Sequence, residues 1–125
     1  MAAYLDPAKR AWRARAIREL HRLARCLEVR GFECSAVRFN PGGVAVSGEA
    51  YLYARRGPDS ISAMATRSEV LGLGECVMLR SEDWPERLGG ARGVHKRSGR
   101  NRFVPFGDPD MEDVAVRASL DKEMV

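Results

Sequence analysis

The 125-residue sequence has few of the side chains on which catalytic and cofactor sites are usually built. It contains two histidines, and its three cysteines (Cys26, Cys34 and Cys76) show no C-x-x-C spacing. An odd number of cysteines without paired spacing predicts neither a disulfide framework nor a zinc site. Gly-rich phosphate loops of the Walker or Rossmann form are also absent from the sequence. We therefore expect no cofactor, no metal and no catalytic residue.

Long apolar runs are missing as well. No stretch approaches the 18 or so apolar residues of a membrane span, and the N-terminal residues lack the continuous apolar segment of a secretory signal. Residues 1–27 are Arg-rich and amphipathic like a transit peptide, but Asp6, Glu19 and Glu28 argue against that interpretation. The expected location is the cytoplasm.

Lysine is scarce, because only Lys9, Lys96 and Lys122 are lysines among the 21 basic residues. Arginine is better suited than lysine to bidentate phosphate contacts and to stacking on flat groups. A GC-rich genome would produce the same bias, so composition alone assigns no ligand.

Charge is unevenly distributed along the chain. Residues 1–107 contain 19 Lys and Arg against 11 Asp and Glu, whereas residues 108–125 contain 2 against 6. A basic body is suited to nucleic acid or to an acidic protein. The acidic segment would neutralise that body either within one chain or across a homodimer. The length is that of one compact domain spanning residues 1–125.

The strongest predicted element is a helix over residues 7–30. Asp6-Pro7 has the pattern of a helix start, and Gly31 that of a helix end. Apolar residues recur between them at steps of three and four, which is typical of one buried helical stripe. The stripe comprises Trp12, Ala16, Leu20, Leu23, Ala24 and Leu27.

The remaining chain predicts an α+β fold, in which the long N-terminal helix packs on a small, mainly antiparallel sheet with a basic β-hairpin and a C-terminal helix. Residues 32–39 and 44–54 form a first hairpin around Asn40-Pro41-Gly42-Gly43, and residues 75–80 form a buried strand. Residues 58–74 fit either a short helix or a strand. Residues 108–120 begin with Asp108-Pro109 and fit a helix slightly better than a strand.

The segment "GVHKRSGRNRF" (93–103) is the first candidate site. If Ser98-Gly99 is a two-residue turn, strand alternation gathers four basic side chains on one face of a hairpin. These are His95, Arg97, Arg100 and Arg102, with Arg92, Lys96 and Asn101 nearby. Such a ribbon fits a nucleic-acid groove, whereas a longer loop would be only a solvated cluster of charge.

A second candidate site is the side of the N-terminal helix opposite its apolar stripe. Arginines recur there at steps of three and four, at positions Arg15, Arg18, Arg22 and Arg25. Three alternatives are open: a solvated surface, a contact with a phosphate backbone, and a contact with an anionic membrane. The membrane alternative ranks last because the fold needs the apolar stripe as core.

The aromatic residues are few, so we expect most of them in the core. These include Tyr51, Tyr53, Trp84, Phe103 and Phe106. Tyr51 and Tyr53 share one face of their strand and are the pair to inspect for a base-stacking platform.

The preferred hypothesis is a non-enzymatic, nucleic-acid-binding accessory protein. The alternative is a protein-interaction module or inhibitor, of the type carried by phages and mobile elements, that docks on an acidic partner or a nucleic-acid-handling complex. A third hypothesis is a metal-dependent nuclease using Asp59, Glu75, Asp83 or Glu86. The sequence "ECV" has Val77 where an Asp…Glu-x-Lys nuclease has its lysine, which weakens this third hypothesis.

Overall fold

The computed structural model describes residues 7–39, 50–68, 72, 74–81 and 101–120, and within these ranges it is an α+β structure. Its elements, in chain order, are α1 (Pro7–Val29), β1 (Glu33–Cys34), β2 (Arg38–Phe39), β3 (Ala50–Arg56), β4 (Asp59–Ser68), β5 (Gly74–Ser81), β6 (Arg102–Pro105) and α3 (Met111–Ser119).

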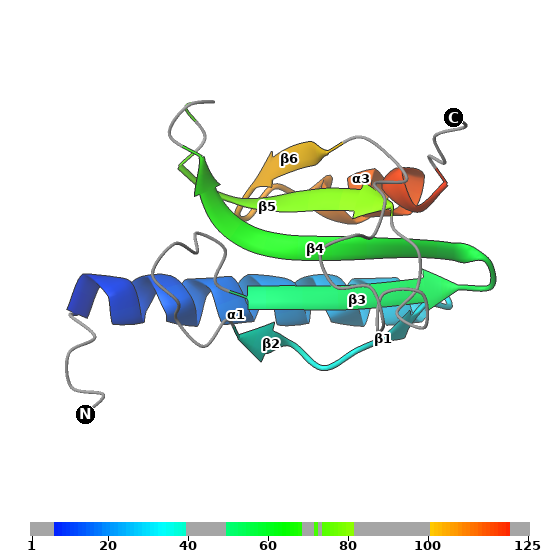
Figure 1. The fold of residues 1–125 in the computed structure, drawn as a ribbon, viewed down its shortest axis with the longest axis horizontal. Coiled ribbons are helices and arrows are strands. Elements are labelled where there is room, and N and C mark those ends of the chain that lie inside the picture. Colours follow the sequence, from blue (N-terminus) through cyan, green and yellow to red (C-terminus); the bar gives the residue numbers. More distant parts are fainter. Residues whose placement is uncertain (1–6, 40–49, 69–71, 73, 82–100, 121–125) are drawn as a thin grey trace, which may run out of the picture.

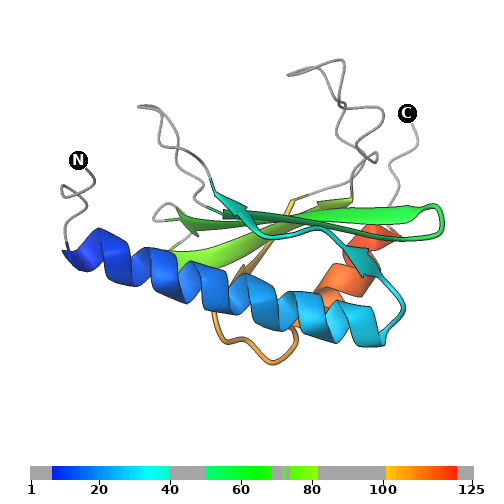
Figure 2. The same cartoon turned by 90° about the horizontal axis from the view of Figure 1, so that it is seen from below.

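The strands form one antiparallel sheet in the order β1-β3-β4-β5-β6, with β2 also paired to β3. Both helices lie on the same side of this sheet (Figures 1 and 2). Helix α1 packs mainly on β3, and α3 packs mainly on β5. The predicted fold, an N-terminal helix on an antiparallel sheet with a C-terminal helix, is confirmed.

Helix α1 follows the predicted range closely, and its apolar stripe is the centre of the core. Trp12, Leu20 and Leu27 on this stripe are all between 0% and 5% exposed. The helix ends in a Schellman motif, in which the Phe32 amide donates to the Leu27 carbonyl oxygen (3.0 Å) and the Gly31 amide to that of Glu28 (3.0 Å). Gly31 has a φ of +92°, a backbone angle that side-chain-bearing residues rarely adopt. The glycine therefore stops the helix and turns the chain back toward the sheet.

Small residues on the sheet allow α1 to lie close to it. Ala50 and Ala54 on β3 and Ala63 and Ala65 on β4 face the helices and are at most 2% exposed. Larger inward residues stand beside these alanines: Leu52 on β3, Ile61 on β4, and Val77 and Leu79 on β5. Strand β5 also packs against α3, whose own buried side chains include Met111, Ala115 and Ala118.

The edge of the sheet beside β3 is interrupted. β1 and β2 have two residues each, and both pair with β3. Between them Ser35 forms two hydrogen bonds with Tyr53. Its amide donates to the Tyr53 carbonyl oxygen (2.8 Å), and its Oγ accepts from the Tyr53 amide (3.0 Å).

Two segments with open predictions are resolved. Residues 59–68 form strand β4. A helix would place Ile61 and Met64 on one face, whereas in the strand Ile61 points to the helices and is buried and Met64 lies on the opposite face. Residues 111–119 are helix α3, which begins later than Asp108-Pro109 predicts: Asp110 is the N-cap residue. Asp108 instead accepts a hydrogen bond from the Asp110 amide through Oδ1 (2.8 Å).

Within the described ranges the first predicted hairpin is present as β1 and β2 paired with β3, and the buried strand predicted at 75–80 is β5. The predicted turn of the first hairpin, residues 40–43, lies outside the described ranges. In the part of the chain that the structure describes, neither helix is long and apolar enough to cross a membrane.

Candidate nucleic-acid interface

The predicted basic hairpin falls largely outside the described residues. Its members Arg92, His95, Lys96, Arg97 and Arg100 are not described, so the turn at Ser98-Gly99 and the shared face remain predictions.

The last two candidates of that hairpin are described. Asn101 is exposed immediately before β6. Arg102 is the first residue of β6, lies opposite Leu79 of β5 and is half-buried. Because Leu79 is a core residue, Arg102 lies on the helix side of the sheet rather than on an open ribbon face.

Two arginines of the α1 stripe form ion pairs with acidic residues that the structure describes, and two do not. Arg15 and Glu75 of β5 form a two-point contact: Nε donates to Oε1 at 2.8 Å and Nη2 donates to Oε2. This hydrogen bonding lowers the pKa of the Glu75 carboxyl and raises the pKa of Arg15. Arg15 therefore joins α1 to β5, and its ligand is within the protein.

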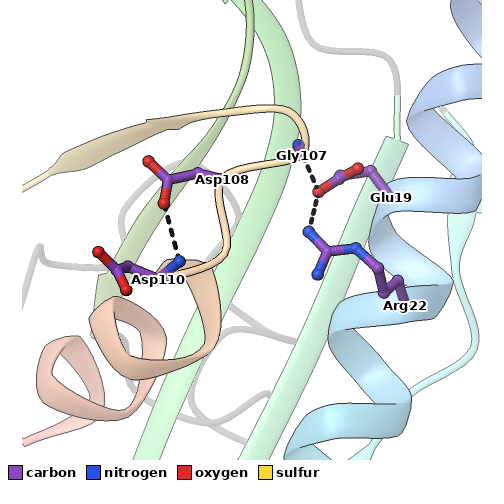
Figure 3. Close-up of polar contacts among 5 residues, drawn as sticks. All are labelled: Glu19, Arg22, Gly107, Asp108 and Asp110. Carbon is purple, nitrogen blue, oxygen red and sulfur yellow. Dashed lines mark hydrogen bonds and ion pairs between the residues drawn. The ribbon is translucent and has the colours of Figure 1, made fainter.

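Arg22 is paired in a similar way, in a cluster drawn in Figure 3. It donates through Nη2 to Oε2 of Glu19, and the Gly107 amide donates to the same oxygen (3.0 Å). Glu19 is only 9% exposed, so its carboxylate needs these two donors in place of water. The cluster links α1 to the turn between β6 and α3, where Gly107 has a φ of +83°.

Arg18 and Arg25, the other two members of the stripe, are exposed on the solvent side of α1. Neither forms an ion pair with any residue that the structure describes. His21 lies between them and is exposed, in agreement with a surface histidine. Among the four predicted arginines, these two are thus the ones without an acidic partner in the part of the chain that the structure describes.

The acidic segment partly neutralises the protein's own body. Arg30, just after α1, contacts Glu112 (Nε to Oε2, 2.6 Å) and Asp113 (Nη2 to Oδ1, 2.6 Å) on the first turn of α3. These contacts raise the pKa of Arg30. Of the two predicted alternatives, neutralisation within one chain is therefore present.

The carboxylates of the nuclease hypothesis do not converge where they are described. Asp59 begins β4, whereas Glu75 lies opposite Arg67 near the other end of β4. At the usual rise per strand residue these positions are about 26 Å apart. Asp83 and Glu86 lie outside the described ranges, and within those ranges no three His, Cys, Asp or Glu residues could share a metal ion.

The structure reveals a different candidate on the face of the sheet opposite the helices. We define this outer face by the alternating residues that point away from α1 and α3. Its larger exposed or partly exposed side chains include Arg38, Tyr51, Tyr53, Arg55, Met64, Met78, Arg80 and Phe103. The smaller residues Ser60, Thr66 and Cys76 point the same way but are buried.

The register of the strands aligns the outer face into rows. Tyr51 lies opposite Arg38 on one side and Met64 on the other, and Met64, Met78 and Phe103 continue the same row across β4, β5 and β6. The next row contains Tyr53, Ser62 and Arg80. Except for Arg38, which is exposed, these side chains are partly exposed. The expectation that Tyr51, Tyr53 and Phe103 are core residues is therefore wrong.

Phe106 does pack on the core. Its ring lies 5.7 Å from that of Trp12, centroid to centroid, with a tilt of 51°. Trp84 lies outside the described residues.

Charge on the outer face is mainly positive. Three arginines lie on it, and among the described strand residues Glu33 is the one acid there, 3.8 Å from Nε of Arg55. Asp59 and Glu75, the other acids of the described strands, fall on the helix side by alternation. Strand alternation identified Tyr51 and Tyr53 as neighbours on one face, but the register that aligns them with Phe103 depends on residues far apart in sequence.

In comparisons with known proteins, no family model, no curated protein and no solved structure matches this chain.

Proposed function

We propose that this protein binds nucleic acid, without catalysis, through the outer face of its sheet. The observation that carries the proposal is the composition of that face: partly exposed aromatic and methionine side chains in one row, with arginines beside them and Glu33 as the one acid among the described strand residues of the face. Arginine supplies paired donors for phosphate oxygens, and aromatic rings supply surfaces on which bases stack.

The described part of the chain resumes after the basic segment at Asn101. Asn101 directly precedes Arg102, which lies opposite Leu79, so Asn101 is at the level of Arg80 on the neighbouring strand. The sequence that reaches Asn101 contains Arg92, Lys96, Arg97 and Arg100. These four cations lie outside the described residues, so their part in nucleic-acid binding remains a prediction from the sequence.

A salt titration tests this proposal. Binding of fluorescein-labelled DNA, measured by anisotropy, should weaken steeply as salt rises, because bound arginines release the counterions of the phosphates. Arg38→Gln should weaken binding and reduce the slope of log K against log salt by about one, the value for one phosphate contact.

Arg117→Gln is the matched control, since it removes one exposed arginine from α3, on the helix side of the sheet. It should leave the affinity and the salt slope as they are. Absence of binding to both single-stranded and duplex DNA at low salt would contradict the proposal.

The second candidate function is docking of a protein on the same face. Met64 and Met78, side by side in the middle of the row, favour it because methionine side chains adapt to varied apolar partners. In that case a partner retained from the native host should stay bound after nuclease treatment, and Met64→Lys should release it. A partner lost on nuclease treatment would exclude this second function and support the first.

A further inference from the structure

We infer that the nucleic acid bound on the outer face is single-stranded DNA, whose unpaired bases stack on Tyr51, Tyr53 and Phe103. This inference rests on the proposed function and specifies its ligand. It follows from the width of the sheet, the spacing of its rings and the side chains that separate them.

The width of the sheet excludes binding of the outer face inside the major groove of a duplex. Residues of the row occupy β2, β3, β4, β5 and β6, which is five neighbouring strand positions. At the usual separation of strands the sheet is about 19 Å wide before side chains are added. The major groove of B-DNA is about 12 Å wide and admits a helix or a two-stranded ribbon. The central residues of the row would therefore never reach paired bases in an undistorted duplex.

The spacing of the aromatic rings fits a single nucleic-acid strand whose bases are not stacked on one another. Tyr51 and Tyr53 are two residues apart on one strand, or about 7 Å, and Tyr51 and Phe103 are three strands apart, or about 14 Å. Bases stacked within a duplex are about 3.4 Å apart along each strand and present only their edges to a protein. A single strand can spread its bases over these rings and present their flat faces.

The positions of the cations agree with a backbone that crosses the sheet. Arg38 lies beside Tyr51 at one end of its row, and Arg80 lies at the opposite end of the row that contains Tyr53. A phosphate beside a base stacked on Tyr51 would thus meet the exposed guanidinium of Arg38, whereas the Nε atom of Arg80 is buried. The one described acid of this face, Glu33, lies next to Arg55, away from the row.

The uncharged side chains favour DNA over RNA. Proteins that select RNA contact the ribose 2′-hydroxyl. On the outer-face side of the described strands, Ser60 and Thr66 are only 8% and 6% exposed, and the partly exposed Ser62 lies in the row of Tyr53 rather than in the row of Tyr51 and Phe103. Between Tyr51 and Phe103 the row consists of two methionines, against which a ribose hydroxyl would be buried without a good partner.

The experiment compares three fluorescein-labelled probes at one low salt concentration: an oligothymidine, an oligouridine of equal length and a duplex of mixed sequence. We expect the affinity order oligothymidine, then oligouridine, then duplex. Tyr51→Leu and Phe103→Leu keep apolar bulk but remove the ring. Each should weaken oligothymidine binding about five- to 150-fold, the range for loss of one stacked base. Tyr51→Phe, which restores the ring, should recover most of the affinity lost in Tyr51→Leu.

Leu120→Ala is the control, because Leu120 is a large exposed side chain (54% exposed) at the end of α3, outside the proposed face. A far-ultraviolet circular dichroism spectrum and a thermal melt of each variant show whether it is folded. If Tyr51→Leu does not fold, Phe103→Leu, at the edge of the sheet, provides the same test.

The outcomes separate this inference from the proposed function. Equal or tighter binding of the duplex, tighter binding of oligouridine, or unchanged oligothymidine binding by both leucine variants overturns the inference and leaves nucleic-acid binding standing. No binding of any probe overturns both. A concentration-dependent dimer that Tyr51→Leu dissociates, without DNA binding, would show instead that a second copy occupies the face.

Discussion

At the scale of single residues, the four arginines of α1 show how one sequence pattern can serve two purposes. Arg15 and Arg22 are held by Glu75 and Glu19 and position elements of the fold, whereas Arg18 and Arg25 remain on the solvent side. Helical spacing predicts that all four avoid the buried stripe. It cannot distinguish them further, because their partners depend on where β5 and the turn at Gly107 lie against the helix.

Cys34 allows a prediction about reactivity. Burial, with a smaller contribution from the negative charge of Glu28, raises the pKa of its thiol from 9.0 to about 11, and its Sγ donates to the Ala24 carbonyl oxygen (3.7 Å). The thiolate is the reactive form, so a shift of this size lowers its population at pH 8 roughly 100-fold. Alkylation of Cys34 by iodoacetamide in the folded protein should be slower than that of free glutathione by at least that factor.

Mass spectrometry of tryptic peptides can follow this reaction, because Arg residues separate Cys34 from Cys26 and Cys76 in the sequence. Glu28→Gln should speed the alkylation, since it removes a charge that disfavours the thiolate. If Cys34 of the folded protein were alkylated as fast as free glutathione, this would contradict the raised pKa of its thiol.

At the scale of elements, periodicity predicted α1 well and β4 poorly, for a physical reason. The stripe of α1 contains Leu20 and Leu23 at consistent steps, so burial and helix propensity agree. The inward side of β4 instead contains Ala63 and Ala65, and alanine has little preference for strands. These alanines are dictated by the helix that lies on them, which is a tertiary requirement that local propensity does not contain.

The C-terminal helix was ambiguous because "VAVRASL" alternates like a strand. Its buried residues Met111, Ala115 and Ala118 are separated by four and three residues, which is the spacing of a helix. Of the candidate site, alternation predicted only that Tyr51 and Tyr53 are neighbours. The row reaching Phe103 depended on pairing between segments that no local pattern specifies.

The contact between α1 and α3 provides a prediction for this scale. Arg30→Glu would place a negative charge beside Glu112 and Asp113, and should lower the melting temperature by about 2–5 °C. Combining it with Glu112→Arg should recover part of the loss, because the attraction is restored with reversed sign. Circular dichroism melts of both single variants and the double variant measure the coupling, and purely additive effects would show that the pair contributes nothing.

At the scale of the whole molecule, the two basic surfaces face opposite directions. Arg18 and Arg25 lie on the solvent side of α1, and α1 covers one side of the sheet, whereas the outer face is the other side (Figure 2). A short nucleic acid bound to one surface therefore cannot contact the other.

This separation predicts that the double variant Arg18→Gln, Arg25→Gln binds an oligothymidine of about eight nucleotides as tightly as the native protein. Arg38→Gln, which removes half as much charge but from the outer face, should weaken the same binding. Anisotropy titrations measure both. A greater loss in the double variant would move the binding surface to α1.

The interrupted edge of the sheet has a consequence for the protein at high concentration. A long, straight edge strand offers unpaired amides and carbonyls on which a strand of another molecule can add, and this leads to aggregation. Here the edge beside β3 is divided into two pieces of two residues, and Ser35 between them already occupies both the amide and the carbonyl oxygen of Tyr53. The described strand at the other edge, β6, has four residues. The described strands at both edges are thus poor templates for sheet extension, which disfavours fibril growth from the sides of a sheet with a broad, partly apolar surface.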